Sequence, residues 1–147
     1  MESDLKWLSE VCNNALLKDK AADKKFFPFH ANIGSTTDWG RPKEQKPSLV
    51  WLNYHQYIWN NLPASDMDFI LIDGRFRIAC ALQAFLRCRE DAVYYVHDFN
   101  NRPPYHVILD YSEVMESVDT SVVLRRKKDP DYVSLALLLQ KHQFDYT

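Results

Sequence analysis

Two apolar runs of strand length end in aspartate, and they constrain the fold more than any other feature of this chain. Residues 69–73 read Phe-Ile-Leu-Ile-Asp, and residues 93–98 read Val-Tyr-Tyr-Val-His-Asp. Between them, residues 76–88 repeat apolar side chains at helical spacing. A strand, a helix and a second strand in this order predict two parallel, buried strands. Both aspartates would then lie at the carboxyl edge of the sheet, where open α/β folds bind ligands.

Helical patterns recur along the rest of the chain. The apolar spacing predicts an amphipathic helix over about residues 4–19 and an aromatic-rich helix over residues 49–61, which Pro63 ends. After the turn at Pro103-Pro104 we expect a helix over residues 105–115. Asp129-Pro130 is typical of an N-cap followed by first-turn proline, and predicts a last helix through Leu139.

The remaining segments predict further strands and one long loop. Residues 26–33 are of β type but contain Pro28, which favours an edge strand. Residues 34–48 have loop composition. A bend at Asp119 followed by the β-branched run 120–123 predicts a strand of a terminal hairpin. We therefore expect one α/β domain over residues 1–147, with a mainly parallel sheet and helices on both faces.

Length and composition narrow the class of protein. With 147 residues and 46% apolar content, the chain can bury a core of its own. The net charge of −2 provides no overall positive field, so nucleic acid is not an expected partner. No apolar run reaches the length of a membrane-spanning helix, so no membrane span is expected.

The cysteines and the first residues bear on the compartment. Cys12, Cys80 and Cys88 are odd in number and lack C-x-x-C spacing, so neither a disulfide framework nor a zinc site is indicated. A cytoplasmic or other reducing location is therefore expected. The opening residues Met1-Glu2-Ser3-Asp4 are acidic, unlike a leader peptide. An organelle matrix stays open if a leader has been removed.

The glycines exclude the usual phosphate-binding loops. Gly34, Gly40 and Gly74 are the three glycines of the chain, and no two of them fit a G-x-G-x-x-G turn or a G-x-x-x-x-G-K-[ST] loop. A cofactor would find no glycine-rich cradle in this sequence.

A strand ending Ile-Asp-Gly, a helix, and a strand ending Val-His-Asp about two dozen residues later resemble the second half of class I S-adenosylmethionine-dependent methyltransferases, the Rossmann-like group. Glu2-Ser3-Asp4 is similar to the segment after the second strand of that family, and Glu2 matches the acid that binds the cofactor ribose. The resemblance covers nearly the whole chain. It implies a truncated Rossmann-like domain whose N-terminal cofactor-binding half, with its glycine-rich loop, is missing.

The resemblance also implies a metal site. In the metal-dependent members, three oxygen ligands lie at these strand ends, and Asp73 and Asp98 match two of them. The third position is Phe99 here, with Asn100 one place away. Mg²⁺ on the two aspartates is one interpretation. The other is structural, with the aspartates capping turns or pairing with neighbouring arginines.

His97 is the candidate general base, because an imidazole beside a carboxylate suits proton abstraction from an acceptor hydroxyl. Asp73 and Asp98 complete the candidate catalytic set. Alternatively, His97 simply hydrogen-bonds backbone at a strand end. Four further residues follow the two strands and are candidates for binding the acceptor, although salt bridges explain the arginines equally well: Arg75, Arg77, Arg102 and Tyr105.

Two functions follow from this resemblance. In the family's sheet, the missing strands would lie beside the strand that ends at Asp73, which leaves an unpaired apolar edge for a protein partner or a second copy to cover. The favoured interpretation is a methyltransferase-like interaction or assembly subunit without catalytic activity of its own. The alternative is an S-adenosylmethionine-dependent O-methyltransferase of a small molecule, with or without metal assistance, completed by another chain or a second copy.

Overall fold

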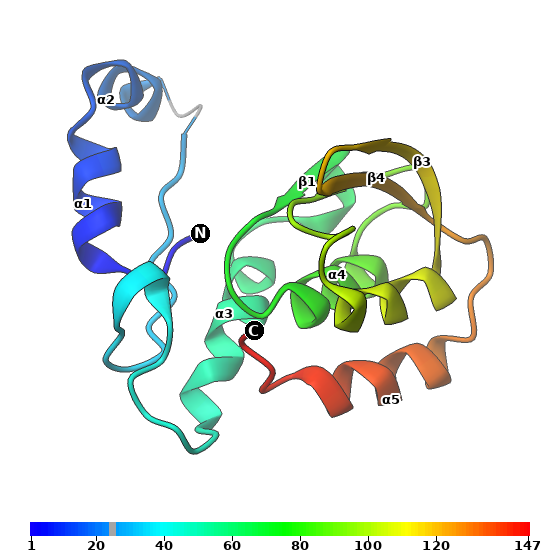
Figure 1. Ribbon diagram of the computed structural model, residues 1–147. Coiled ribbons are helices and arrows are strands. Elements are labelled where there is room, and N and C mark those ends of the chain that lie inside the picture. The colour runs from blue at the N-terminus through cyan, green and yellow to red at the C-terminus, as the bar shows by residue number, and fades with distance from the viewer. Residues whose placement is uncertain (24–25) are drawn as a thin grey trace.

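The computed structural model describes residues 1–23 and 26–147, and in these residues four strands form one open sheet (Figure 1). The strands are β1 (Phe69–Ile72), β2 (Val93–Val96), β3 (Ser112–Val118) and β4 (Ser121–Arg126), in the order β1-β2-β4-β3. β1 pairs with β2 in parallel, whereas β4 is antiparallel to both of its neighbours. β1, β2 and β3 therefore run in one direction, and the α/β class is confirmed. The sheet itself is mixed rather than mainly parallel, because β4 is inserted between β2 and β3 and pairs antiparallel with both.

One face of the sheet carries the main core. Helix α4 (Arg77–Arg87) connects β1 to β2, the 3-10 helix η5 (Pro103–Asp110) follows β2, and α5 (Tyr132–His142) packs against α4. Alternate strand residues such as Ile72, Tyr94 and Leu124 are buried toward this layer. Burial of such apolar side chains is the main stabilising contribution to the fold.

The other face differs from the prediction of helices on both faces. Phe69 and Leu71, which point away from α4, are 60% and 61% exposed, so no described helix covers them. Helices α1 (Leu5–Asn13) and α2 (Ala15–Ala22) stand away from the sheet (Figure 1). They contain no buried residue within the described part of the chain, so they do not pack against the strands.

The predicted helix over residues 4–19 is two helices, α1 (Leu5–Asn13) and α2 (Ala15–Ala22). The break lies at Asn14, whose backbone is extended and whose side-chain oxygen accepts a hydrogen bond from Leu16 N at 3.1 Å. Asparagine competes in this way with the helical backbone, and the residue becomes a cap rather than part of a continuous helix.

The strand predicted over residues 26–33 is not formed. A single parallel bridge joins His30 to Glu2, with Glu2 N donating to Phe29 O at 2.9 Å and Ala31 N donating to Glu2 O at 2.8 Å. Pro28 provides no backbone donor, which limits pairing on that side. Residues 34–48 form the predicted loop, with one short 3-10 turn, η1 (Asp38–Gly40).

The predicted helix over residues 49–61 is confirmed as three short helical segments in succession, η2 (Leu49–Leu52), α3 (Asn53–Gln56) and η3 (Tyr57–Asn60). A further 3-10 turn, η4 (Ala64–Asp66), leads into β1. Trp51 and Tyr54 from these segments form a second buried cluster with Phe76, against which Tyr146 packs.

Two boundaries near the C-terminus differ from the prediction. Residues 112–115, expected to be helical, belong to β3, because their backbone pairs with β4. The N-cap of α5 is Asp131, two residues beyond the predicted Asp129, and its carboxylate accepts from Val133 N and Ser134 N. The hairpin itself turns at Asp119, as predicted.

Two further observations on the described residues concern the cysteines and the length of the helices. Cys12, Cys80 and Cys88 are free thiols. None of the described helices combines the length and apolar character needed to cross a bilayer.

Candidate functional site

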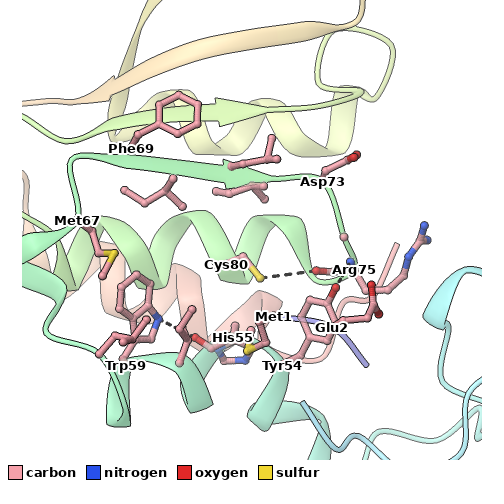
Figure 2. A pocket seen from close by; sticks show the side chains of 16 residues that line it. Met1, Glu2, Tyr54, His55, Trp59, Met67, Phe69, Asp73, Arg75 and Cys80 are labelled. Carbon is pink, nitrogen blue, oxygen red and sulfur yellow. Dashed lines mark hydrogen bonds between the residues drawn. The ribbon is translucent and has the colours of Figure 1, made fainter. Parts of the chain in front are cut away.

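A cavity of about 510 Å³ lies beside the free edge of β1, and we refer to it as the β1 cavity. Residues 69–72 form one side of it, and Tyr54, His55 and Trp59 form the other (Figure 2). Cys80 of α4 lines the space between them. This volume is in the range of protein ligand pockets, and its walls are mostly apolar.

Glu2, Asp73 and Arg75 lie at one end of the β1 cavity, where β1 ends (Figure 2). The Glu2 carboxylate accepts hydrogen bonds from Ser3 N at 2.6 Å and from Asp4 N at 2.9 Å. The structure thus brings Glu2, predicted as a cofactor ligand, close to the end of β1, although the two are far apart in the sequence.

Gly74 is required where the chain leaves β1. Tyr54 Oη accepts a hydrogen bond from Arg75 N at 3.0 Å, and a Cβ atom at position 74 would lie only 2.0 Å from that oxygen. Burial, the largest influence, raises the pKa of Tyr54, so its hydroxyl stays protonated. The Ile-Asp-Gly ending therefore reflects close packing against Tyr54.

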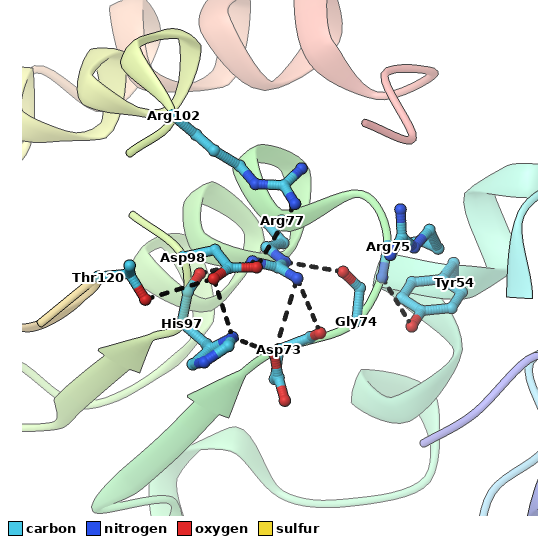
Figure 3. Close-up of polar contacts among 9 residues, drawn as sticks. All are labelled: Tyr54, Asp73, Gly74, Arg75, Arg77, His97, Asp98, Arg102 and Thr120. Carbon is cyan, nitrogen blue, oxygen red and sulfur yellow. Dashed lines mark hydrogen bonds and ion pairs between the residues drawn. The ribbon is translucent and has the colours of Figure 1, made fainter. Parts of the chain in front are cut away.

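Arg77 ties together the ends of the two parallel strands (Figure 3). Its side chain is 4% exposed. Nε donates to Gly74 O at 2.9 Å, Nη2 donates to Asp73 O at 3.1 Å, and Nη1 donates to His97 O at 2.5 Å. A guanidinium has the planar set of donors that such a three-point contact requires.

The two strand-end carboxylates also contact arginine. Arg77 lies 3.6 Å from Asp73 Oδ1 and 3.4 Å from Asp98 Oδ2, and Arg102 lies 3.4 Å from Asp98 Oδ2. Thr120 Oγ1 donates to Asp98 Oδ1 at 3.3 Å. Partial burial by itself raises the pKa of Asp98, but the nearby charges of His97, Arg77 and Arg102 outweigh it and lower the pKa. Asp98 is therefore held as an anion.

His97 faces both carboxylates. Its Nδ1 lies 2.9 Å from Asp73 Oδ1 and 3.6 Å from Asp98 Oδ1, and the side chain is 43% exposed. An imidazole oriented by a carboxylate and open to solvent has the geometry of a general base. The same contacts equally serve to hold the two strand ends together.

Tyr105 is buried inside this group of side chains. It is 2% exposed, and its ring faces the guanidinium carbons of Arg77 at 5.7 Å and of Arg102 at 5.8 Å. These are cation–π contacts. Tyr105 and Arg102 thus belong to the polar cluster at the strand ends, whereas Arg75 lies in the β1 cavity.

Most predicted site residues are therefore brought together in two adjacent places, the β1 cavity and the polar cluster at the strand ends. Asp73 lies where the two places meet. Sequence reasoning did not predict the contact of Thr120 with Asp98 or that of Tyr54 with the turn at Gly74. A signal for Thr120 existed, since it follows the predicted bend at Asp119. Nothing in the local sequence indicated that Tyr54 reaches Gly74.

The backbone at the site is unusual at two positions. Asp98 and Phe76 have φ values of +53° and +54°, in the left-handed region, which non-glycine residues seldom occupy. Such conformations cost free energy and persist only where the surroundings enforce them. Here they turn the chain directly after β2 and directly before α4.

The donor set does not fit Mg²⁺ well. Among the described residues, no group of three or more His, Cys, Asp or Glu side chains is placed to hold a metal ion. Both candidate ligands, Asp73 and Asp98, already face the guanidinium of Arg77. Asn100 Nδ2 donates hydrogen bonds to Ser117 Oγ and to Asp119 O, both 2.8 Å away, which fixes this side chain against the hairpin. A divalent cation would have to compete with a buried positive charge.

Comparisons with known proteins bear on the fold. No family model matches the sequence, and no curated protein matches it. A solved structure of a methyltransferase-like protein from Silicibacter pomeroyi superimposes with a TM-score of 0.75 at 20% identity, over 98% of this chain and 74% of that chain. The chain therefore has a methyltransferase-like, Rossmann-like fold.

Proposed function

We propose that this chain is a methyltransferase-like interaction subunit, which joins a larger assembly through the open edge of its sheet and performs no methyl transfer by itself. The observation that carries the proposal is the free edge of β1 beside an apolar cavity. Unpaired strand edges are templates for pairing with other chains, and native proteins usually cover or block them.

The cluster at the strand ends supports the structural role. Arg77 is buried and uses its donors on three backbone carbonyls, and it also contacts both candidate catalytic carboxylates. Charges paired in this way are typical of a site that fixes two strand ends. A fold often keeps its shape where its chemistry differs.

A second candidate rests on a different observation. Glu2 and Asp73 line the same cavity, as a cofactor ribose and its neighbouring groups would require. In this alternative the protein is an S-adenosylmethionine-dependent O-methyltransferase of a small molecule, and another chain or a second copy completes the cofactor site. S-adenosylmethionine would supply the methyl group, Glu2 would bind the ribose, and His97 would take the proton of the acceptor.

Calorimetric titration of the full chain with S-adenosylmethionine separates the two candidates. For the interaction subunit we expect no saturable heat in a sample that unfolds cooperatively. Saturable micromolar binding to the chain alone, lost in Glu2→Gln, would overturn the proposal in favour of the enzyme.

The assembly role has its own measurement. The full chain is tagged and expressed in the organism from which it comes. In a lysate of those cells it should elute from a size-exclusion column at a larger apparent mass than the purified chain alone. Elution of all the cellular protein as free monomer would contradict an assembly role.

A further inference from the structure

The hydrogen-bond pattern of β1 identifies which backbone groups are free. Val93 N donates to Asp68 O at 2.9 Å, and His97 N donates to Ile72 O at 3.1 Å. In a parallel pair, alternate residues of a strand face the partner strand. Residues 68, 70 and 72 therefore face β2, and the backbone groups of Phe69 and Leu71 lie on the free edge of β1, which borders the β1 cavity.

The shape of the β1 cavity favours one strand over the sheet edge of a second copy. The wall made by Tyr54, His55 and Trp59 stands across the cavity from β1 (Figure 2). The edge of a second copy would bring its own helical layer against this wall. A single extended segment would lie along the edge of β1, with the side chains of one face directed into the cavity toward Cys80 and this wall.

A free positive charge marks one end of the β1 cavity. Within residues 1–23 and 26–147, Arg75 Nε is buried without a hydrogen-bond partner, and no ion pair to a carboxylate is formed by this side chain. Burial and the neighbouring charges of Arg77 and Arg41 lower the pKa of Arg75. Arg75 as a whole is partly buried, so its guanidinium keeps one buried donor without a partner, and an acidic group on a ligand would form a charge-assisted hydrogen bond with it.

We propose that the β1 cavity binds one extended, apolar segment of a partner chain, which pairs with the backbone of Phe69 and Leu71 as an added strand and places an acidic residue against Arg75. This inference rests on the proposed interaction function and names the chemistry of its partner. Main-chain hydrogen bonds would provide affinity, and the apolar walls and Arg75 would provide specificity.

The test attaches a probe strand to the full chain. Met1 lines the cavity, so a flexible Gly-Ser linker from Met1 can carry the segment Thr-Val-Leu-Val-Val-Asp-Ser into it at high effective concentration. Amide hydrogen exchange is then measured by NMR. We expect the amides of Phe69 and Leu71 to exchange ~100-fold more slowly than in the chain without the probe, as local opening is suppressed.

Matched variants show whether pairing and charge are responsible. A probe with proline in place of its central valine should give no protection, because proline lacks the backbone donor. Arg75→Gln should reduce protection by the Asp probe ~10-fold and leave an Asn probe unaffected, as expected for one charge-assisted hydrogen bond. The amides of Ile70 and Ile72, which face β2, report whether each variant remains folded.

Several results would overturn the inference. Unchanged exchange at Phe69 and Leu71 with the probe attached would show that the edge accepts no strand. Equal protection by the proline probe would show that no strand pairing occurs. Protection that grows with the concentration of the unextended chain would identify a second copy as the occupant.

The outcomes also distinguish this inference from the proposed function. If the probe fails while the chain still elutes in a large complex, the chain joins its assembly through another surface and only this inference is wrong. If S-adenosylmethionine alone protects the two amides, the cavity is a cofactor site and the proposed function fails as well.

Discussion

Arg77 connects the ends of β1 and β2 through three backbone carbonyls. Arg77→Lys would leave a single ammonium in place of the planar guanidinium, so at least part of this contact is lost. We expect a decrease of about 2–4 kcal/mol in the free energy of unfolding, because buried acceptors lose their donors. Urea denaturation would measure it.

The matched control for this change is Arg102→Lys. Arg102 contacts the same Asp98 carboxylate, but it is 39% exposed. A partly exposed pair is worth less, so we expect a loss below about 1 kcal/mol. Equal losses in the two variants would contradict the view that Arg77 is the residue that holds the strand ends together.

His55 gives the stability of the protein a pH dependence. It is 1% exposed, and burial lowers its pKa from 6.5 to about 4, although Gln143 O, 3.3 Å from Nε2, opposes the shift. Because the folded pKa is below the unfolded one, the unfolded state binds more protons, and stability falls as the pH drops from 6.5 toward 4. The loss between about pH 7 and pH 5 should be about 2 kcal/mol.

The variant His55→Gln isolates this contribution. Glutamine does not titrate, so its unfolding free energy should change less than that of the original protein over the same pH interval. Unfolding in urea at both pH values gives the comparison. If both proteins lose the same stability, another group is responsible for the pH dependence.

At the scale of elements, removal of an N-cap should affect stability differently in helices that bury core residues and in helices that do not. Asp131 caps α5, which buries Leu135 against the core, and Asp4 caps α1, which buries no residue in the described structure. Asp131→Ala should lower the free energy of unfolding by about 1 kcal/mol. Asp4→Ala breaks the same kind of cap but should change global stability little. A thermal melt of each variant tests the pair, and equal changes would show that α1 belongs to the cooperative core.

The sequence predicted elements best where the pattern was long or strongly apolar. β1, α4 and β2 follow from an uninterrupted alternation of buried strand and amphipathic helix, and with them the meeting of Asp73 and Asp98. The errors arose where another interaction outweighed the apolar spacing of the sequence. Asn14 divided one helix through its own side chain. Residues 112–115 became strand because pairing with β4 outweighed helical spacing.

The residues of the candidate site also differed in whether the sequence could predict their positions. Asp73, His97 and Asp98 were predictable because strand ends in one parallel sheet meet at one edge. The contact of Tyr54 with Gly74 was not, because it depends on how a distant helical segment packs. Nor could the sequence show that Arg77, and not Arg75, would be the arginine that contacts both aspartates.

At the scale of the whole molecule, α1 and α2 form an arm beside the main body (Figure 1). They pack mainly against each other, and Leu5, Trp7 and Leu16 are more than half exposed. Regions with few buried contacts open locally without global unfolding. We expect the amides of α1 and α2 to be protected from hydrogen exchange at least ~100-fold less than those of α4. Hydrogen exchange followed by mass spectrometry measures this difference. Equal protection of the two regions would show that the arm unfolds only together with the core.

The central position of β4 has a consequence for synthesis on the ribosome. β4 lies between β2 and β3 but follows both in the chain, so a nascent polypeptide cannot complete its sheet until residues 121–126 have emerged. Until then β1 and β2 form a two-stranded unit that is bare on both sides, which favours pairing between neighbouring nascent chains. The interval between translation of β2 and of β4 is therefore the period in which these strand edges are most open to pairing with other chains.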